Sequence, residues 1–170
     1  MLRHPSPTVN PPDDRSGEEI VLRAAVPSDA ARITECVAAA YAQWIPRIGR
    51  KPWPMLQDYA AVIDAEIVVV ATVEGVVEGV LVLSVTDDGF LIENVAVFPG
   101  LAGRGLGRAL LMRAEQEARA RGFDSIYLYT NEKMTENIGL YERIGYVEYE
   151  RREEQGFRRV FLRKALASSS

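Results

Sequence analysis

Apolar and polar positions along the chain alternate between strand-like and helix-like segments. In the helix-like segments apolar residues recur every three or four positions: in a helix starting at Ser28 or Asp29 and ended by Pro46, in a short one over about 55–63, in a longer one after residue 105, and in one over 134–144. Strand-like patterns, either alternating or continuously β-branched, occupy residues 19–24, 67–73, 76–85, 90–97, 125–130, 146–152 and 157–164.

This order, β-α-α-β-β-β-α-β-α-β-β, predicts the α+β (mixed α/β) class. Short turn signals at Glu74-Gly75, 86–89 and 154–156 predict antiparallel hairpins. The helix between the strands at 90–97 and 125–130 requires a parallel crossover. We therefore expect a central mixed, mostly antiparallel sheet flanked by helices. Residues 45–54, with three prolines and a glycine, are expected to form a loop.

Composition narrows the possible functions. The 170 residues suffice for one domain, expected over 18–165, between a proline-rich disordered tail (1–17) and a short tail (166–170). The net charge of −4 argues against a nucleic-acid surface, and no apolar run of about 20 residues is present for a membrane span. Cys36 is the only cysteine, and the only histidine, His4, lies in the expected tail. A lone cysteine permits no intrachain disulfide and fits a reducing compartment, so we expect a cytoplasmic protein. No metal-ligand spacing occurs, so we expect no metal.

A glycine-rich turn follows the strand at 90–97 and precedes the longest helix. Gly103, Gly105 and Gly107 alternate there. A helix N-terminus at such a turn gathers unpaired N–H groups and the positive end of the helix dipole, and a phosphate is the usual occupant. Neither the P-loop spacing nor the Gly-x-Gly-x-x-Gly dinucleotide spacing fits these glycines.

The segment Ala102-Gly-Arg-Gly-Leu-Gly107 resembles the Gln/Arg-x-x-Gly-x-Gly/Ala pattern that opens the coenzyme A pyrophosphate site of the GNAT superfamily of N-acetyltransferases. Ala102 departs from the pattern by lacking the usual Gln or Arg. The helix that ends in Tyr141-x-x-x-Gly145-Tyr146 resembles the second signature of that superfamily. The predicted order of elements from about residue 19 to 164 also matches the GNAT fold.

The resemblance implies acetyl-CoA as co-substrate. It implies cofactor contacts from residues 95–97, from the glycine turn at 103–108 and from the helix that carries Tyr141. Asn137 lies four residues before Tyr141, so both share a face of their helix. Tyr141 is expected near the thioester sulfur as the general acid that protonates the departing thiolate; taken alone, it would be a half-buried core aromatic. The remaining cofactor contacts are expected from Val95, Ala96, Val97, Gly103, Arg104, Gly105, Leu106, Gly107 and Arg108.

The attacking amine must lose a proton, and Glu93 is the candidate general base because it interrupts an otherwise apolar strand. The alternative is a carboxylate that merely points to solvent. Asn94 faces the other side of a regular strand, but a bulge would exchange the two, so Glu93, Asn94 and water all remain possible proton acceptors. In the GNAT superfamily the acceptor pocket is built partly by the first two helices and their loop, here 41–59, where Tyr41 and Trp44 are candidate substrate contacts.

The predicted function is therefore acetyl-CoA-dependent transfer of an acetyl group to a primary amine, by direct attack in a ternary complex. The partner is a small-molecule or peptide amine, with neither nucleic acid nor membrane involved, and a homodimer is possible. The alternative is a non-catalytic acyl-CoA-binding regulatory module of the same fold. The residues do not select the acceptor amine.

Overall fold

The computed structural model describes residues 19–101 and 103–167, built around a seven-stranded sheet of order β1-β2-β3-β4-β5-β7-β6. The expected tail at 1–17 and the last three residues of the tail at 166–170 lie outside the described part. Only β4 and β5 are parallel, and the other neighbours are antiparallel. The strands are β1 (Ile20–Ala24), β2 (Ile67–Val73), β3 (Val76–Thr86), β4 (Gly89–Val97), β5 (Ser125–Asn131), β6 (Val147–Glu154) and β7 (Phe157–Ala165).

The expected fold class is confirmed, and the three predicted hairpins form with registers Val73↔Val76, Thr86↔Gly89 and Glu154↔Phe157. The helices are α1 (Ala30–Tyr41), α2 (Ile45–Ile48), α3 (Tyr59–Ala65), α4 (Leu106–Ala120) and α5 (Thr135–Arg143), with 3-10 turns at Pro27–Asp29, Ala42–Trp44, Trp53–Leu56 and Pro99–Leu101.

Two details of the first helical region were predicted wrongly. Pro46 does not end the helix, because the chain continues through the turn Ala42–Trp44 into α2, where Pro46 lies in the first turn and its missing N–H has no helical partner to lose. The expected loop at 45–54 therefore begins with a helical turn. The short helix expected at 55–63 is α3, shifted toward the C-terminus because Asp58 caps it by accepting a hydrogen bond from the N–H of Ala60 (3.1 Å).

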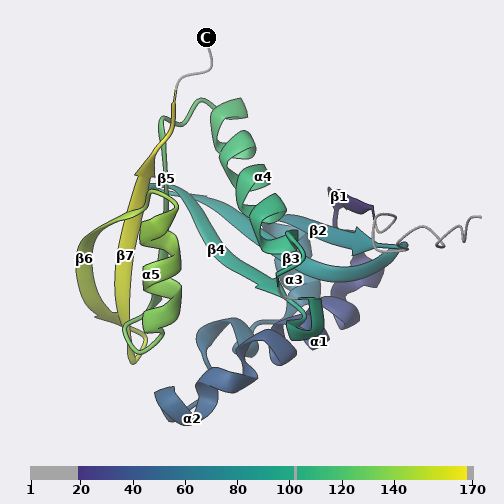
Figure 1. The fold of residues 1–170 in the computed structure, drawn as a ribbon, viewed down its shortest axis with the longest axis horizontal. Coiled ribbons are helices and arrows are strands. Elements are labelled where there is room, and N and C mark those ends of the chain that lie inside the picture. The colour runs from purple at the N-terminus through teal and green to yellow at the C-terminus, as the bar shows by residue number, and fades with distance from the viewer. Residues whose placement is uncertain (1–18, 102, 168–170) are drawn as a thin grey trace, which may run out of the picture.

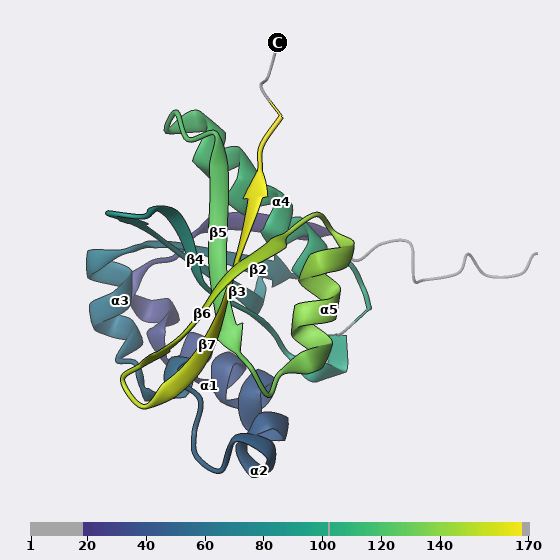
Figure 2. The ribbon, with the colours of Figure 1, turned by 90° about the vertical axis from the view of Figure 1, so that its left-hand side faces the viewer.

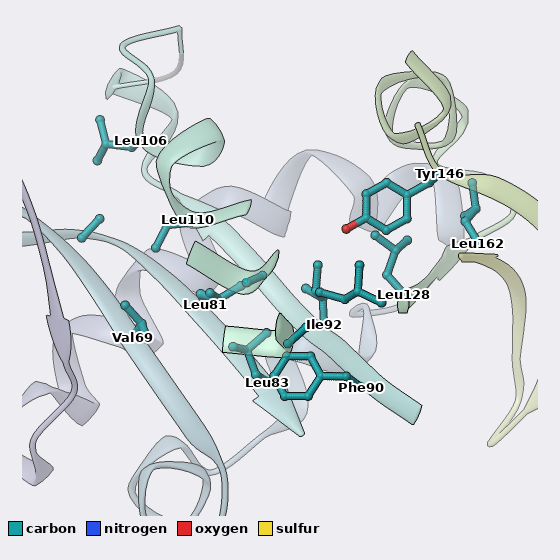
Figure 3. Close-up of a cluster of buried hydrophobic side chains, with 14 of the residues drawn as sticks. Val69, Leu81, Leu83, Phe90, Ile92, Leu106, Leu110, Leu128, Tyr146 and Leu162 are labelled. Atoms are coloured by element: carbon teal, nitrogen blue, oxygen red, sulfur yellow. The ribbon is translucent and has the colours of Figure 1, made fainter. Parts of the chain in front are cut away.

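Helices cover both faces of the sheet. Figure 2 shows α4 and α5 on one side and α1 and α3 on the other. The apolar face of α4 predicted from its four-residue spacing is buried against β2, β3, β4 and β5, and Figure 3 shows Leu106 and Leu110 in this cluster. The opposite face packs α1 and α3 on a second cluster that contains Val70, Val80 and Val82.

The strands β4 and β5 separate in the middle of the sheet. They pair only at Leu91↔Tyr127 and Ile92↔Leu128, although β4 continues to Val97 and β5 to Asn131. Figure 1 shows the two strands diverging from their paired ends. This divergence leaves one edge of β4 without a strand partner at the centre of the fold.

Candidate active site

A groove of about 840 Å³ lies between α4 and α5, beside the free edge of β4. It contains six residues that the sequence assigned to cofactor binding or catalysis, and they come from three separate elements. They are Val95 and Val97 from β4, Gly107 and Arg108 from α4, and Asn137 and Tyr141 from α5.

The backbone of β4 presents unpaired groups to this groove. The N–H of Phe98 donates to the carbonyl of Glu78 (3.0 Å), so Phe98 directs its N–H toward β3. Because backbone N–H groups alternate sides along a strand, Val95 and Val97 direct theirs the other way, toward the opening beside β5. An extended ligand lying in the opening can therefore hydrogen-bond to β4 as an added strand does.

The start of α4 is an anion-binding arrangement. Gly105 is the N-cap in the left-handed region (φ 86°), and within the described residues no side chain caps the helix. The first helical hydrogen bond runs from the N–H of Ala109 to the carbonyl of Gly105 (3.0 Å), so the N–H groups of residues 106–108 have no acceptor within the helix. These groups and the helix dipole favour a phosphate at this point.

Four of the expected contacts take more restricted roles. Gly103 and Gly105 shape the turn, and the N–H of Arg104 donates to the carbonyl of Leu101 (3.3 Å) within it. The side chain of Leu106 is buried in the core, so only its backbone reaches the anion site. Ala96 is not brought to the groove, because its side chain packs on the opposite face of the sheet, beside α1.

Tyr141 is half-buried in the groove, with its ring edge-on to that of Tyr146 at 5.8 Å between centroids. Burial raises the pKa of the Tyr141 phenol to about 12, so the hydroxyl keeps its proton at every working pH. Tyr146 lines the same groove, and its buried hydroxyl has no hydrogen-bond partner among the described residues. Figure 3 shows this hydroxyl directed away from Leu162 on β7.

A β-bulge at Glu93 decides which way the polar residues of β4 point. Val82 pairs with Asn94 and Leu83 pairs with Ile92, so Glu93 is the extra residue. In a bulge two successive side chains lie on the same side of the sheet, in place of the alternation of a regular strand. Glu93 and Asn94 accordingly line a common cavity on the face that carries α1 and α3.

Asn94 is occupied by structural hydrogen bonds. Its amide oxygen accepts from the hydroxyl of Tyr41 (2.8 Å), and its amide nitrogen donates to the hydroxyl of Tyr59 (3.1 Å). The hydroxyl of Tyr59 in turn donates to the carbonyl of Pro54 (2.6 Å). The chain of hydrogen bonds ties β4 to α1 and to the loop before α3, and it leaves Asn94 as an unsuitable proton acceptor.

Glu93 lines a second cavity, of about 50 Å³, on the same face together with Tyr41, Trp53 and Tyr129. Its carboxyl is half-buried, and its pKa is raised, first by burial and then by the nearby carboxylate of Glu66. A carboxyl group in this setting holds a proton more readily than a solvated one, as a general base requires. We call this cavity the acceptor cavity.

The groove and the acceptor cavity both lie beside the divergence of β4 from β5. Val95 and Val97 of β4 line the groove, and Glu93 of β4 lines the cavity together with residues 129–131 of β5. Burial raises the pKa of the Tyr41 phenol well above its ordinary value, with a further contribution from the phenol of Tyr141. Tyr41 lines the acceptor cavity and Tyr141 lines the groove. Trp44 is placed differently, since it is buried beneath the guanidinium of Arg47 (4.9 Å) and is not among the residues that line the acceptor cavity.

Sequence reasoning missed the part of the acceptor cavity that comes from later in the chain, which includes Tyr129 on β5 and Arg159 on β7. Nothing in the sequence singles out Arg159, because the same strand also carries Arg158, Arg163 and Lys164.

In residues 19–101 and 103–167 no group of three or more His, Cys, Asp or Glu side chains is placed to hold a metal ion. Among the helices of the same residues, none combines the length and apolar character needed to cross a membrane.

Comparison with solved structures shows the same fold. The protein yncA from Salmonella typhimurium, solved with its cofactor acetyl-CoA, superimposes with a TM-score of 0.67 at 23% identity, covering 89% of this chain and 96% of that one. The ribosomal-protein-S18-alanine N-acetyltransferase from Escherichia coli gives 0.71 at 20% identity, covering 89% and 97%. At these identities the likeness concerns the fold alone.

Sequence relatives match over shorter segments. The mycothiol acetyltransferase of Frankia casuarinae is 39% identical over 57 residues, which is 34% of this chain and only 17% of that protein's length. An uncharacterized N-acetyltransferase of Escherichia coli, YjgM, is 34% identical over 55 residues, or 32% of this chain and 33% of that protein. The model of the acetyltransferase (GNAT) family matches residues 34–146, about two thirds of the chain. That match spans the glycine turn, the divergent strands and Tyr141, and the chain belongs to the GNAT family of acetyltransferases.

Proposed function

We propose that this protein transfers an acetyl group from acetyl-CoA to a primary amine by direct attack in a ternary complex. One observation carries the proposal: the groove that holds Tyr141 and the cavity that holds Glu93 are both lined by β4 where it diverges from β5. A proton donor and a proton acceptor thus lie on the two sides of the position where an acyl group and an amine can meet.

The residues of the groove fit coenzyme A in chemistry and in shape. The N–H groups of residues 106–108 suit its pyrophosphate, and the free backbone groups of Val95 and Val97 suit its extended amide arm. Asn137 lies in the same groove and offers an amide for further polar contact. When bound, acetyl-CoA supplies an activated acetyl group and a thiol leaving group.

Three groups of this chain are assigned to the chemistry. The carboxylate of Glu93 takes a proton from the incoming ammonium, directly or through one water. A backbone N–H of Val95 or Val97 stabilises the oxygen on which negative charge develops. The hydroxyl of Tyr141 donates to the departing sulfur. Asn94 acts indirectly, because it fixes Tyr41 at the wall of the acceptor cavity.

Direct attack is supported by the state of Cys36. This thiol is fully buried in α1, lies 3.7 Å from the carbonyl oxygen of Glu78, and has its pKa raised to about 12, chiefly by burial. A thiol that stays protonated and inaccessible is a poor nucleophile, so an acyl-cysteine intermediate is disfavoured.

A small-molecule or peptide amine is the proposed partner. The similarity to segments of mycothiol acetyltransferases supports an acetyltransferase, although the shared segment is a small part of those proteins. A homodimer and a cytoplasmic location remain expectations from the sequence.

The proposal is tested by following thiol release from acetyl-CoA in the presence of a panel of primary amines, with an amine-free reaction as the control for hydrolysis. Amine-dependent thiol release and the matching N-acetyl product are expected. Saturable acetyl-CoA binding without turnover on any amine would instead favour a non-catalytic acyl-CoA-binding module.

A further inference from the structure

Arg159 is a buried cation at the wall of the acceptor cavity. It lies on β7 with 7% of its surface exposed, and it lines the cavity together with Glu93 and Tyr129. Its Nη1 donates to Oε2 of Glu154 at 2.7 Å. A buried guanidinium requires compensating negative charge, because burial removes its hydration.

Not every nitrogen of this guanidinium is satisfied. Glu154 is shared, because its other oxygen forms an ion pair with Nε of Arg152 (2.7 Å), a residue that also pairs with Glu150 (3.4 Å) and Asp88 (3.8 Å). The Nη2 of Arg159 is buried without a hydrogen-bond partner among the described residues. The guanidinium instead lies against the ring of Tyr129, 4.3 Å from its centroid, and 6.0 Å from that of Trp53. Stacking supports the cation but supplies no anion.

The cavity therefore carries opposite charges at two places. The phenol of Tyr129 has its pKa raised by burial, lowered by the charge of Arg159 and raised by that of Glu93, so both charges lie near this ring. No ion pair joins Glu93 to Arg159 within the described residues, although both line the cavity. A compact zwitterion, with an ammonium at Glu93 and an anion at Arg159, complements this arrangement.

We propose that Arg159 is a specificity-determining residue that binds the carboxylate of the acceptor, and that the acceptors are free amino acids. This inference rests on the proposed function. The guanidinium donates to the carboxylate through the Nη2 that lacks a partner, and it thereby orients the amine toward Glu93. The small cavity, of about 50 Å³ before any adjustment, favours a compact acceptor over a long polyamine.

The transfer itself balances without another reactant. A nitrogen–carbon bond forms as the carbon–sulfur bond of the thioester breaks. Two protons leave the ammonium nitrogen, of which one ends on the sulfur and the other in solvent. The carboxylate of the acceptor is unchanged, because its part is to be held by Arg159.

The first test uses the unmodified protein. Each amino acid is compared with its α-amide and with the amine that lacks the carboxylate, at saturating acetyl-CoA. The amide has a less basic amine and so more free amine at neutral pH, whereas the decarboxylated amine is more basic; a preference for the acid over both is therefore not an effect of basicity. We expect kcat/KM to favour the acid by about 10- to 10²-fold, the range for a hydrogen bond to a charged group. Equal values would overturn the inference.

The second test uses Arg159→Gln, Arg159→Lys and the control Arg158→Gln. Arg158 is the neighbour of Arg159 on β7, but its side chain is 71% exposed and pairs with Glu132. Arg159→Gln is expected to abolish the preference for the acid while KM for acetyl-CoA is unchanged. Arg159→Lys should restore part of it, and Arg158→Gln should keep all of it. If Arg159→Gln does not fold, the comparison of acids with amides on the unmodified protein still decides whether the acceptor site prefers a carboxylate.

Binding of N-acetyl amino acids and their amides, measured by calorimetry in the presence of coenzyme A, separates this inference from the proposed function. Turnover with no preference for the carboxylate overturns the inference alone. Arg159-dependent binding of the N-acetyl amino acid without turnover on any acceptor overturns the proposed function and supports the carboxylate site. If the protein neither binds N-acetyl amino acids nor turns over any acceptor, both the inference and the proposed function are overturned.

Discussion

Replacing Tyr141 by Phe removes one hydroxyl from the groove and retains the ring that packs edge-on against Tyr146. If the hydroxyl donates to the departing sulfur, the variant should lose turnover while its affinity for acetyl-CoA changes little. The size of the loss depends on whether the proton is transferred completely or only shared in a hydrogen bond.

The structure favours a shared proton. Burial raises the pKa of Tyr141 to about 12, whereas an ordinary thiol has a pKa of about 8.5. Complete transfer to the thiolate is then unfavourable by about 3.5 pKa units, or about 5 kcal/mol at 1.36 kcal/mol per unit. A hydrogen bond to a charged group contributes about 1.5–3 kcal/mol, which corresponds to a loss of about 10- to 10²-fold in kcat.

The assay is steady-state thiol release across neutral and mildly alkaline pH, with acetyl-CoA affinity measured separately by calorimetry. Tyr149→Phe is the control, because Tyr149 is an exposed tyrosine on β6. Parental kcat in the Tyr141→Phe variant would show that the hydroxyl has no part in catalysis. A loss near about 10⁴-fold, the upper end for general acids, would refute the shared proton and indicate complete transfer.

Three further variants test other parts of the structure. Glu93→Gln should lower turnover at neutral pH and also raise the melting temperature there. Burial raises the folded-state pKa of Glu93, so its protonated form stabilises the fold at low pH, and this stabilisation is lost as pH rises through that pKa. A variant with the same melting temperature as the parent at every pH would contradict this reasoning. Gly105→Val should lower the free energy of unfolding by about 1–2 kcal/mol, because residue 105 has a left-handed backbone, and should weaken coenzyme A binding, measured by calorimetry, about tenfold or more. Gly122→Val is the control: its φ is similar (83° against 86°) and the space around it at the other end of α4 is equally open, so it should lose stability without losing affinity. Leu110→Ala, fully buried under α4, should lower the free energy of unfolding by about 2–5 kcal/mol in denaturant titration, against a change within about 0.5 kcal/mol for the exposed Met112→Ala on the same helix.

The local pattern of the sequence determined the elements and much of the groove between α4 and α5. The spacing of apolar residues in α4, the glycine turn before it and the three hairpins depend on neighbours along the chain, and the structure contains all of them. Asn137 and Tyr141 share a groove for the same reason, since residues four apart on a helix lie on one face. The continuation of the first helical region through Pro46 was not foreseen, because a proline in a first helical turn is compatible with the helix.

Only the tertiary structure decided the acceptor side. A bulge depends on the register of two strands, so the sequence left open whether Glu93 or Asn94 would be the candidate base. The bulge turns both side chains toward the same face of the sheet. Asn94 is then occupied by its hydrogen bonds to Tyr41 and Tyr59, which leaves Glu93 as the candidate. The placement of Arg159 beside the cavity of Glu93 depends on the strand order β4-β5-β7-β6, in which β7, the last strand in the chain, lies between β5 and β6. Periodicity along the chain carries no information on such pairs, because contacts between distant segments are set by sheet order and packing.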